Sequence, residues 1–299
     1  SGLAANYSIS AGQTTTANIT AKSLTVSGIT ASNKTYDGST NVTLDASLVA
    51  YSGLVSGDTF EGTYTGVFAD KNVGVGKTVT ITPSYSGADV SNYSVTDQSS
   101  TTANITAKSL TVSGITASDK TYDGSTNATL TGSAVYSGLV SGDTFDGSYT
   151  GVFADANVGT GKTVTITSSY TGADVNNYSV TDQSSTTADI SAKALTATAS
   201  ASNKTYDGGT TASTILTFTG LVGSETLGQT VGSTFDNKNV GSNKTVTVNS
   251  ITLSDGSGLA ANYSISAGQT TTANITAKSL TVSGITASNK TYDGSTNVT

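Results

Sequence analysis

The sequence predicts an all-β protein built from tandem domains, and three observations support this prediction. A segment of about 85 residues recurs along the chain, apolar and polar residues alternate with a period of two, and turn signals separate the alternating runs. No stretch sustains the period of an amphipathic helix. We therefore expect an array of small β-sandwich, Ig-like domains joined by short extended linkers. The alternative is an array of β-grasp-like domains, each with one short helix near residues 46–52.

The repeats can be placed by identical strings. The tetrapeptide Ala-Lys-Ser-Leu begins at Ala21, Ala107 and Ala277, and Ala-Lys-Ala-Leu begins at Ala192. Residues 1–43 recur unchanged as residues 257–299, so three units form a larger repeat of 256 residues. We expect the natural protein to continue in both directions. We assign the chain as follows: 1–20, the end of a preceding unit; 21–106, repeat 1; 107–191, repeat 2; 192–276, repeat 3; 277–299, the start of the next unit.

Strands are predicted from the alternation within one unit. In repeat 1, Phe60, Tyr64 and Phe68 fall on one face of a strand, and each other unit has apolar residues at the same spacing. One apolar face and one Thr/Ser face is typical of a half-buried antiparallel sheet. The predicted strands of repeat 1 are 23–32, 40–45, 58–68, 77–84, 92–97 and 101–106, with an extra one near 48–55.

The linker between repeats 1 and 2 is predicted to be extended. Residues 101–112 contain no Gly and no Pro. Ile105 and Leu110 are five residues apart, so they point to opposite faces of a continuous strand. We expect Ile105 to end the core of one domain and Leu110 to begin the core of the next. Each domain would then have its own core, with a stiff connection to its neighbour.

Composition excludes several functions. The 299 residues include no Cys and no His, and the 13 basic residues, all Lys, leave a net charge of −7. Without Cys and His the chain lacks disulfides, thiol nucleophiles, thiolate metal sites and the commonest general base. An acidic chain without Arg is a poor ligand for nucleic acid, and no apolar run is long enough to insert in a membrane. We therefore expect no enzyme activity, and no catalytic, cofactor-binding or metal-binding residues.

Three further motifs are weaker indications of function. Gly76-Lys77-Thr78 resembles the end of a phosphate-binding loop but lacks the earlier Gly and leads into a strand. The acidic residues that recur in every unit are interpreted as turn residues, although a structural Ca²⁺ site in a loop or between domains is left open. The lysines and the Asn or Asp residues that a covalent Lys–Asn cross-link requires are present, but we interpret the lysines as solvated surface residues. The recurring acidic residues are Asp37, Asp123 and Asp207, and Asp58, Asp143 and Glu225; the Asn or Asp residues of the last strands are Asn104, Asp189 and Asn274.

A family resemblance follows from the recurring strings. Lys34-Thr35-Tyr36-Asp37-Gly38, Asn72-Val73-Gly74 and Asn92-Tyr93-Ser94-Val95 resemble the YDG repeat domain, and the resemblance covers essentially the whole chain. That domain occurs in very large bacterial surface and secreted proteins, including filamentous-haemagglutinin-like adhesins of the two-partner secretion type. The resemblance implies an extracellular, Gram-negative setting and a role in adhesion or biofilm, with no catalytic residues to carry over.

The expected function follows from the composition and repeats together with the family resemblance. We expect the structural repeat region of an extracellular adhesin or biofilm-matrix fibre on the bacterial cell surface, forming a stiff rod or a self-assembled filament. The expected partners are further copies of the same repeat, with surface glycans as a second class. The alternative function is a multivalent glycan-binding module. Tyr36, Tyr64 and Tyr93 lie where core packing explains them, which argues against an exposed aromatic glycan site.

Overall fold

The computed structural model describes residues 2 and 4–297 and confirms an all-β chain with three repeats of about 85 residues. Its described helices are the short 3-10 turns η1 (Ala4–Asn6), η2 (Val90–Asn92), η3 (Val175–Asn177) and η4 (Ala260–Asn262). No helix in the described part of the chain has the length and hydropathy to span a bilayer. The chain forms two compact units, whose boundary runs through repeat 2. The first consists of Ser1–Gly114, Ser133–Tyr149 and Ser168–Gln183, and the second of Ile115–Gly132, Thr150–Thr167 and Ser184–Thr299.

One half of repeat 1, which we call its head, contains a three-stranded sheet. The central strand β1 (Lys22–Ser27) pairs antiparallel with β5 (Ala50–Ser52) and parallel with β8 (Tyr93–Thr96). The alternation within β1 places Leu24 and Val26 inside, at 0% and 2% exposure, and its other side chains outside. A short pair of strands, β2 (Thr30–Ala31) and β4 (Leu44–Asp45), lies beyond this sheet in sequence.

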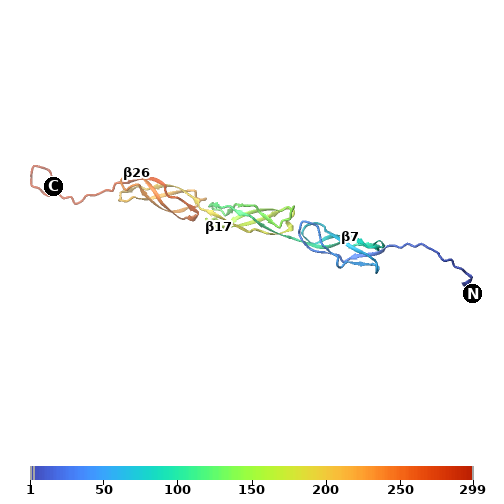
Figure 1. Ribbon diagram of the computed structural model, residues 1–299. Coiled ribbons are helices and arrows are strands. Elements are labelled where there is room, and N and C mark those ends of the chain that lie inside the picture. The colour runs from blue at the N-terminus through green and yellow to red at the C-terminus, as the bar shows by residue number, and fades with distance from the viewer. Residues whose placement is uncertain (1, 3, 298–299) are drawn as a thin grey trace. The chain divides into compact units, whose positions relative to one another are not determined.

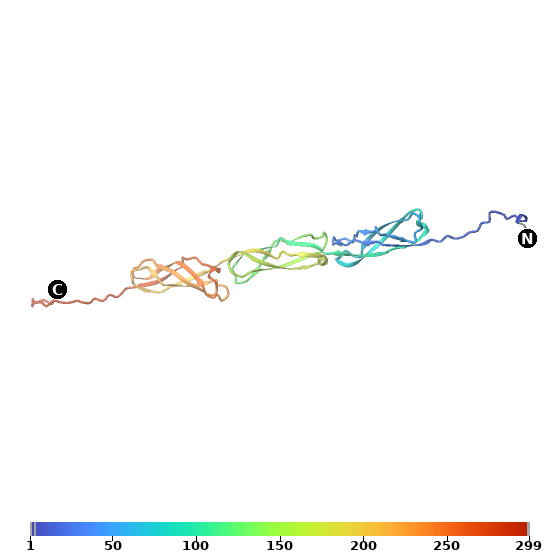
Figure 2. The same cartoon turned by 90° about the horizontal axis from the view of Figure 1, so that it is seen from below.

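The other half, the tail, contains a four-stranded sheet in the order β3-β9-β7-β6. Strand β7 (Gly74–Ser86) is antiparallel to both β6 (Glu61–Phe68) and β9 (Ser100–Thr106), and β3 (Lys34–Thr35) is parallel to β9. A β-bulge interrupts β7 between Gly74 and Lys77. The sheets are curled. Figure 1 and Figure 2 show the long strands β7 and β26 running along the length of their repeats.

Repeats 2 and 3 use the same plan. In the first unit, the head of repeat 2 has the sheet order β15-β10-β18, which matches β5-β1-β8. In the second unit, the tails of repeats 2 and 3 have five-stranded sheets that add one edge strand to the plan of repeat 1. The remaining strands of repeat 2 are β10 (Lys108–Ser113), β11 (Thr116–Ala117), β12 (Lys120–Thr121), β13 (Asn127–Ala128), β14 (Leu130–Thr131), β15 (Val135–Ser137), β16 (Asp146–Phe153), β17 (Gly159–Thr171), β18 (Tyr178–Thr181) and β19 (Ser185–Ser191). Those of repeat 3 are β20 (Lys193–Ala194), β21 (Thr196–Ala201), β22 (Lys204–Thr205), β23 (Thr211–Ala212), β24 (Thr214–Thr219), β25 (Leu227–Phe235), β26 (Gly241–Asp255), β27 (Tyr263–Ser264) and β28 (Thr270–Thr276).

Two local predictions for repeat 1 are wrong. The helix expected near 46–52 in the β-grasp alternative is a turn followed by β5, because the Asp45 carboxylate accepts a hydrogen bond from the Ser47 N–H at 2.9 Å and holds a turn there. The strand predicted at 23–32 is broken at Gly28, whose φ of +87° ends β1 before β2 begins. The strands predicted at 58–68, 92–97 and 101–106 are confirmed by β6, β8 and β9.

Repeats 1 and 3 have buried clusters of their own, but the prediction that each core is separate from that of the neighbouring repeat is wrong at the junctions. The extended run is confirmed, since β9 and β10 are separated only by Ala107, and Ile105 and Leu110 are 1% and 0% exposed. These two residues, however, belong to one cluster that continues from the tail of repeat 1 into the head of repeat 2. Its members are Tyr36, Phe68, Val79, Ala103 and Ile105 from repeat 1, and Leu110, Phe145 and Tyr178 from repeat 2.

The same continuity is found in the second unit. A buried cluster joins Tyr122, Phe153, Val164, Ala188 and Ile190 of repeat 2 to Leu195 and Tyr263 of repeat 3. Burying a large apolar side chain stabilises a fold by about 1.5–3 kcal/mol. The apolar residues at each junction therefore stabilise two neighbouring repeats together.

Candidate functional site at the repeat junctions

The junction between repeats 1 and 2 is built around Tyr36, which follows the short strand β3. The Tyr36 N–H donates to the Thr106 carbonyl at 2.8 Å, so the tyrosine is held at the end of the tail sheet. Its ring is 1% exposed and packs edge-on against Tyr178 of repeat 2, with centroids 5.6 Å apart. Its hydroxyl donates a 2.7 Å hydrogen bond to Asp143 Oδ2, also in repeat 2.

Asp143 has three bonding partners at this junction. Besides Tyr36, it accepts a hydrogen bond from the Tyr178 hydroxyl at 2.5 Å, and Lys71 Nζ lies 3.0 Å from its Oδ1. Lys71 also pairs with Asp174 Oδ1 at 2.9 Å. The Asp143 side chain is 3% exposed and that of Asp174 is 11% exposed, whereas Lys71 reaches them from a partly solvated position. One lysine of repeat 1 thus bridges two carboxylates of repeat 2.

The ionisation of these groups follows from their partners. Burial opposes ionisation of Asp143, but hydrogen bonds from Tyr178, Tyr36 and Lys71 outweigh it and lower its pKa. The pKa of Asp174 is lowered by the Thr144 N–H and by Lys71. Burial and the hydrogen bond to Asp143 raise the pKa of Tyr178 to about 12, and the same two causes raise that of Tyr36. At neutral pH both carboxylates are charged and both phenols are neutral.

The two residues after Tyr36 have different roles. The Asp37 carboxylate accepts hydrogen bonds from the Ser39 N–H at 2.8 Å and from Lys34 Nζ at 2.7 Å, so it shapes the turn, as predicted. Gly38 has a φ of +79°, and a Cβ built on it would lie 2.8 Å from Cγ1 of Val140 in repeat 2. This position therefore needs glycine both for its backbone conformation and for contact with the next repeat.

A backbone contact completes the junction. The Val73 N–H donates to Asn177 Oδ1 at 2.9 Å, and Asn177 Nδ2 donates to Asn72 Oδ1 at 3.1 Å. Asn177 lies in η3 and is 3% exposed. Its side chain accepts a hydrogen bond from a partly buried backbone amide of the preceding repeat.

The junction between repeats 2 and 3 reproduces most of this geometry. The Tyr122 and Tyr263 hydroxyls donate to Glu225 at 2.7 and 2.6 Å, and the two rings lie 5.4 Å apart. The Val158 N–H donates to Asn262 Oδ1 at 2.9 Å, and a Cβ on Gly124 would lie 2.8 Å from Val222. Burial and the bond to Glu225 raise the pKa of Tyr122 to about 12.

The two junctions differ in their ion pairs. Ala156 occupies the position of Lys71, and Leu259 occupies the position of Asp174. The lysine and its second carboxylate are therefore both present at one junction and both replaced by apolar residues at the other.

The recurring acidic residues thus divide into two groups. Asp37, Asp123 and Asp207 pair with Lys34, Lys120 and Lys204 within their turns, which confirms the prediction for this group. The turn interpretation was incomplete for Asp143 and Glu225, because each accepts a tyrosine hydroxyl from the preceding repeat. The available signal was the recurrence of both a tyrosine and an acidic residue in register. In the described residues, no group of three or more acidic side chains is gathered in a way that could hold a metal ion.

The other sequence motifs have structural partners. Lys77 of Gly76-Lys77-Thr78 lies in strand β7 and pairs at 2.7 Å with Asp70, which precedes the strand. Asn104 Oδ1 accepts a hydrogen bond from the Gly76 N–H at 2.8 Å, and Asp189 and Asn274 accept equivalent bonds from Gly161 and Asn243. These last-strand residues therefore support the bulge of the long strand. Tyr36 and Tyr93 are buried, as predicted, and the Tyr64 hydroxyl lies 3.1 Å from that of Tyr51.

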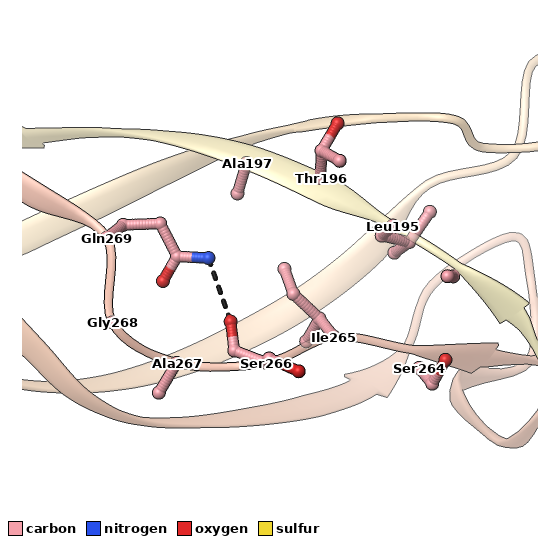
Figure 3. A pocket seen from close by; sticks show the side chains of 10 residues that line it. Leu195, Thr196, Ala197, Ser264, Ile265, Ser266, Ala267, Gly268 and Gln269 are labelled. Atoms are coloured by element: carbon pink, nitrogen blue, oxygen red, sulfur yellow. Dashed lines mark hydrogen bonds between the residues drawn. The ribbon is translucent and has the colours of Figure 1, made fainter.

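A groove distinguishes the head of repeat 3 (Figure 3). In repeat 1, β1 and β8 pair over four residues, but in repeat 3 the parallel pairing ends at Ala194 and Ser264. The segments 194–197 and 264–269 then separate around a volume of about 490 Å³. Gln269 Nε2 donates to the Ser266 carbonyl at 2.8 Å, while its buried Oε1 has no partner among the described residues. The lining has no ionisable side chain, so it offers no group for acid–base catalysis.

Comparison with known families agrees with the repeat structure. The YDG domain matches residues 20–103, 106–188 and 191–273. The chain belongs to the YDG domain family. In these YDG repeats, Tyr36 and Gly38 of the signature contact the next repeat, and Asp37 shapes the turn in which all three residues lie. No curated protein and no solved structure matches the chain.

Proposed function

We propose that these YDG repeats form the structural region of a bacterial extracellular adhesin or biofilm-matrix fibre of the two-partner secretion type. The observation that carries the proposal is the core shared between neighbouring repeats. A chain of repeats that share cores resists bending and separation at the junctions better than domains on flexible linkers. Such a region can hold a binding domain away from the cell, or associate laterally into a filament.

The side chains of the chain favour a structural role over a catalytic one. The chain has no His or Cys, and recurring acidic side chains such as those of Asp37 and Asp143 are engaged in a turn and in a junction. A sandwich of Ig-like type is part of the proposal. It is supported by a buried cluster in which Val26 of β1 and Ile29, which follows β1, pack with Ile81 of β7.

Electron microscopy of the purified 299-residue chain at physiological salt tests the structural role. Single thin particles with a regular beading at the repeat length would support a stalk, and ordered bundles would support a self-assembling fibre. Irregular aggregates or flexible strings would contradict both. Labelling of intact producing cells with antibodies against the repeats tests the surface location, and labelling only after permeabilisation would contradict it.

A second candidate function is multivalent glycan binding, favoured by the groove of repeat 3. Its hydroxyl groups and the unpartnered Gln269 amide oxygen are suited to hydrogen bonds with sugar hydroxyls. A glycan array probed with the intact chain and with Gln269→Ala tests this function. Binding that the substitution abolishes would support it, and an array without signal would contradict it.

A further inference from the structure

The tail of repeat 3 has the same kinds of residues that form the junctions after repeats 1 and 2, but here they are more exposed to solvent. Tyr206 occupies the position of Tyr36 and Tyr122, which are 1% and 5% exposed, yet Tyr206 is only half-buried. Its hydroxyl has no partner within the described residues. Val240, the counterpart of Val73 and Val158, is 55% exposed. A Cβ on Gly208 would meet nothing within 4 Å, whereas Gly38 and Gly124 contact the next repeat.

A hollow marks the uncovered face. It has a volume of about 380 Å³ and is lined by Tyr206, Asn239 and Val240 together with Ala277, Lys278 and Leu280. The last three are the counterparts of Ala107, Lys108 and Leu110, which begin repeat 2. Leu110 is completely buried at its junction, but Leu280 is 87% exposed. In the described residues, this face of repeat 3 is therefore not covered in the way that the corresponding faces of repeats 1 and 2 are.

The head of repeat 1 has the complementary groups, also uncovered. Asp58, Asp89 and Asn92 occupy the positions of Asp143, Asp174 and Asn177. Asn92 is exposed, whereas Asn177 and Asn262 are 3% and 2% exposed at their junctions. Val55, the counterpart of Val140, is 44% exposed.

Charge indicates which head fits the tail of repeat 3. Lys71 is followed by a head with two carboxylates, Asp143 and Asp174, and Ala156 is followed by a head with Glu225 and Leu259. Repeat 3 has Lys238 at this position, so by the same relationship it requires a head with two carboxylates. A lysine opposite leucine would be desolvated with one partner fewer, which costs free energy.

We propose that Tyr206, Lys238, Asn239 and Val240 form a docking surface for the head of a repeat with the sequence of repeat 1. The bond from Lys238 to the two carboxylates at positions 58 and 89 of that repeat selects it over the head of repeat 3. Residues 277–299 are identical to residues 21–43, which assigns this occupant. The inference concerns the order of repeats and does not depend on an extracellular or adhesive role.

The test extends the full chain by one repeat. A copy of residues 44–106 added after Thr299 completes a first-type repeat, and amide hydrogen exchange at Val240 reports docking. The Val240 N–H should acquire an asparagine acceptor like those of Val73 and Val158, so we expect exchange at least 100-fold slower than in the 299-residue chain. Asn92→Ala in the added copy should remove this protection. No gain in protection would overturn the proposal.

Selectivity is tested by a mismatched extension. In this chain, Thr276 is followed directly by a copy of residues 192–276, whose head carries Glu225 and Leu259. We expect Val240 protection at least ten-fold lower than with the first-type repeat, and Lys238→Ala should reduce the difference. Equal protection in the two chains would overturn the selection. The Val73 amide, within the junction of repeats 1 and 2, is the internal control and should not change.

Discussion

The Tyr36 hydroxyl donates a 2.7 Å hydrogen bond to Asp143 Oδ2, 107 residues later in the chain. Tyr122 and Glu225 repeat this relationship at the next junction, also at 2.7 Å. The signature turn of a YDG repeat thus serves the repeat that follows it. The Tyr and the Gly of the recurring Tyr-Asp-Gly sequence are explained by contacts with the next repeat, and the Asp by its turn within the same repeat.

Gly38→Ala should destabilise the chain more than Gly208→Ala. Both glycines have positive φ, +79° and +83°, so both substitutions cost about 1–2 kcal/mol of backbone strain. Only the Cβ at residue 38 would clash with Val140, which should add about 1–3 kcal/mol. Urea unfolding of the two variants measures the difference. Equal losses would show that Gly38 has no packing role at the junction.

Asn177→Ala should cost about 1–3 kcal/mol, because it leaves the partly buried Val73 N–H without its acceptor. Asn92→Ala is the matched control, since Asn92 has the same place in repeat 1 but is exposed. Its cost should stay within about 0.5 kcal/mol. Faster hydrogen exchange at Val73 in the first variant alone would confirm the cause, and unchanged exchange would refute it.

The effects of Lys71→Ala and Asp174→Leu on the free energy of unfolding should be coupled. Either substitution alone breaks the pair at the first junction, whereas the double variant has the Ala and Leu found at the second junction. We expect the double variant to be less destabilised than the sum of the two single variants. Unfolding in urea at low and high salt measures this, and purely additive losses would contradict the matched-pair account.

Acid should weaken the first junction. The pKa values of Asp143 and Asp174 are lower in the fold than the ordinary value of about 3.9 in the unfolded chain. Their stabilisation is therefore complete above about pH 5 and is lost as the pH falls through the lowered values. Asp174→Asn should reduce the slope of unfolding free energy against pH below pH 4. An unchanged slope would exclude Asp174 as a contributor.

The sequence was sufficient for the repeats and most strands because exact internal copies and two-residue alternation are local signals. Phe60 and Phe68 were placed inside correctly for this reason. The shared core could not be recognised, since alternation shows that Tyr36 is buried but not which repeat buries it. The interpretation of Asp143 was incomplete for a related reason. A carboxylate in a Gly-containing turn has the same local sequence whether it caps the turn or accepts a bond from a distant tyrosine.

A double-mutant cycle between Tyr36→Phe and Asp143→Ala tests the central claim, that neighbouring YDG repeats are coupled through their junction. The account predicts that the unfolding free energies are non-additive by about 1–2 kcal/mol, as expected for groups that share a hydrogen bond. The same cycle with Tyr206→Phe in place of Tyr36→Phe should be additive. Additivity within about 0.3 kcal/mol for Tyr36 and Asp143 would show that the repeats are independent domains and would contradict the account.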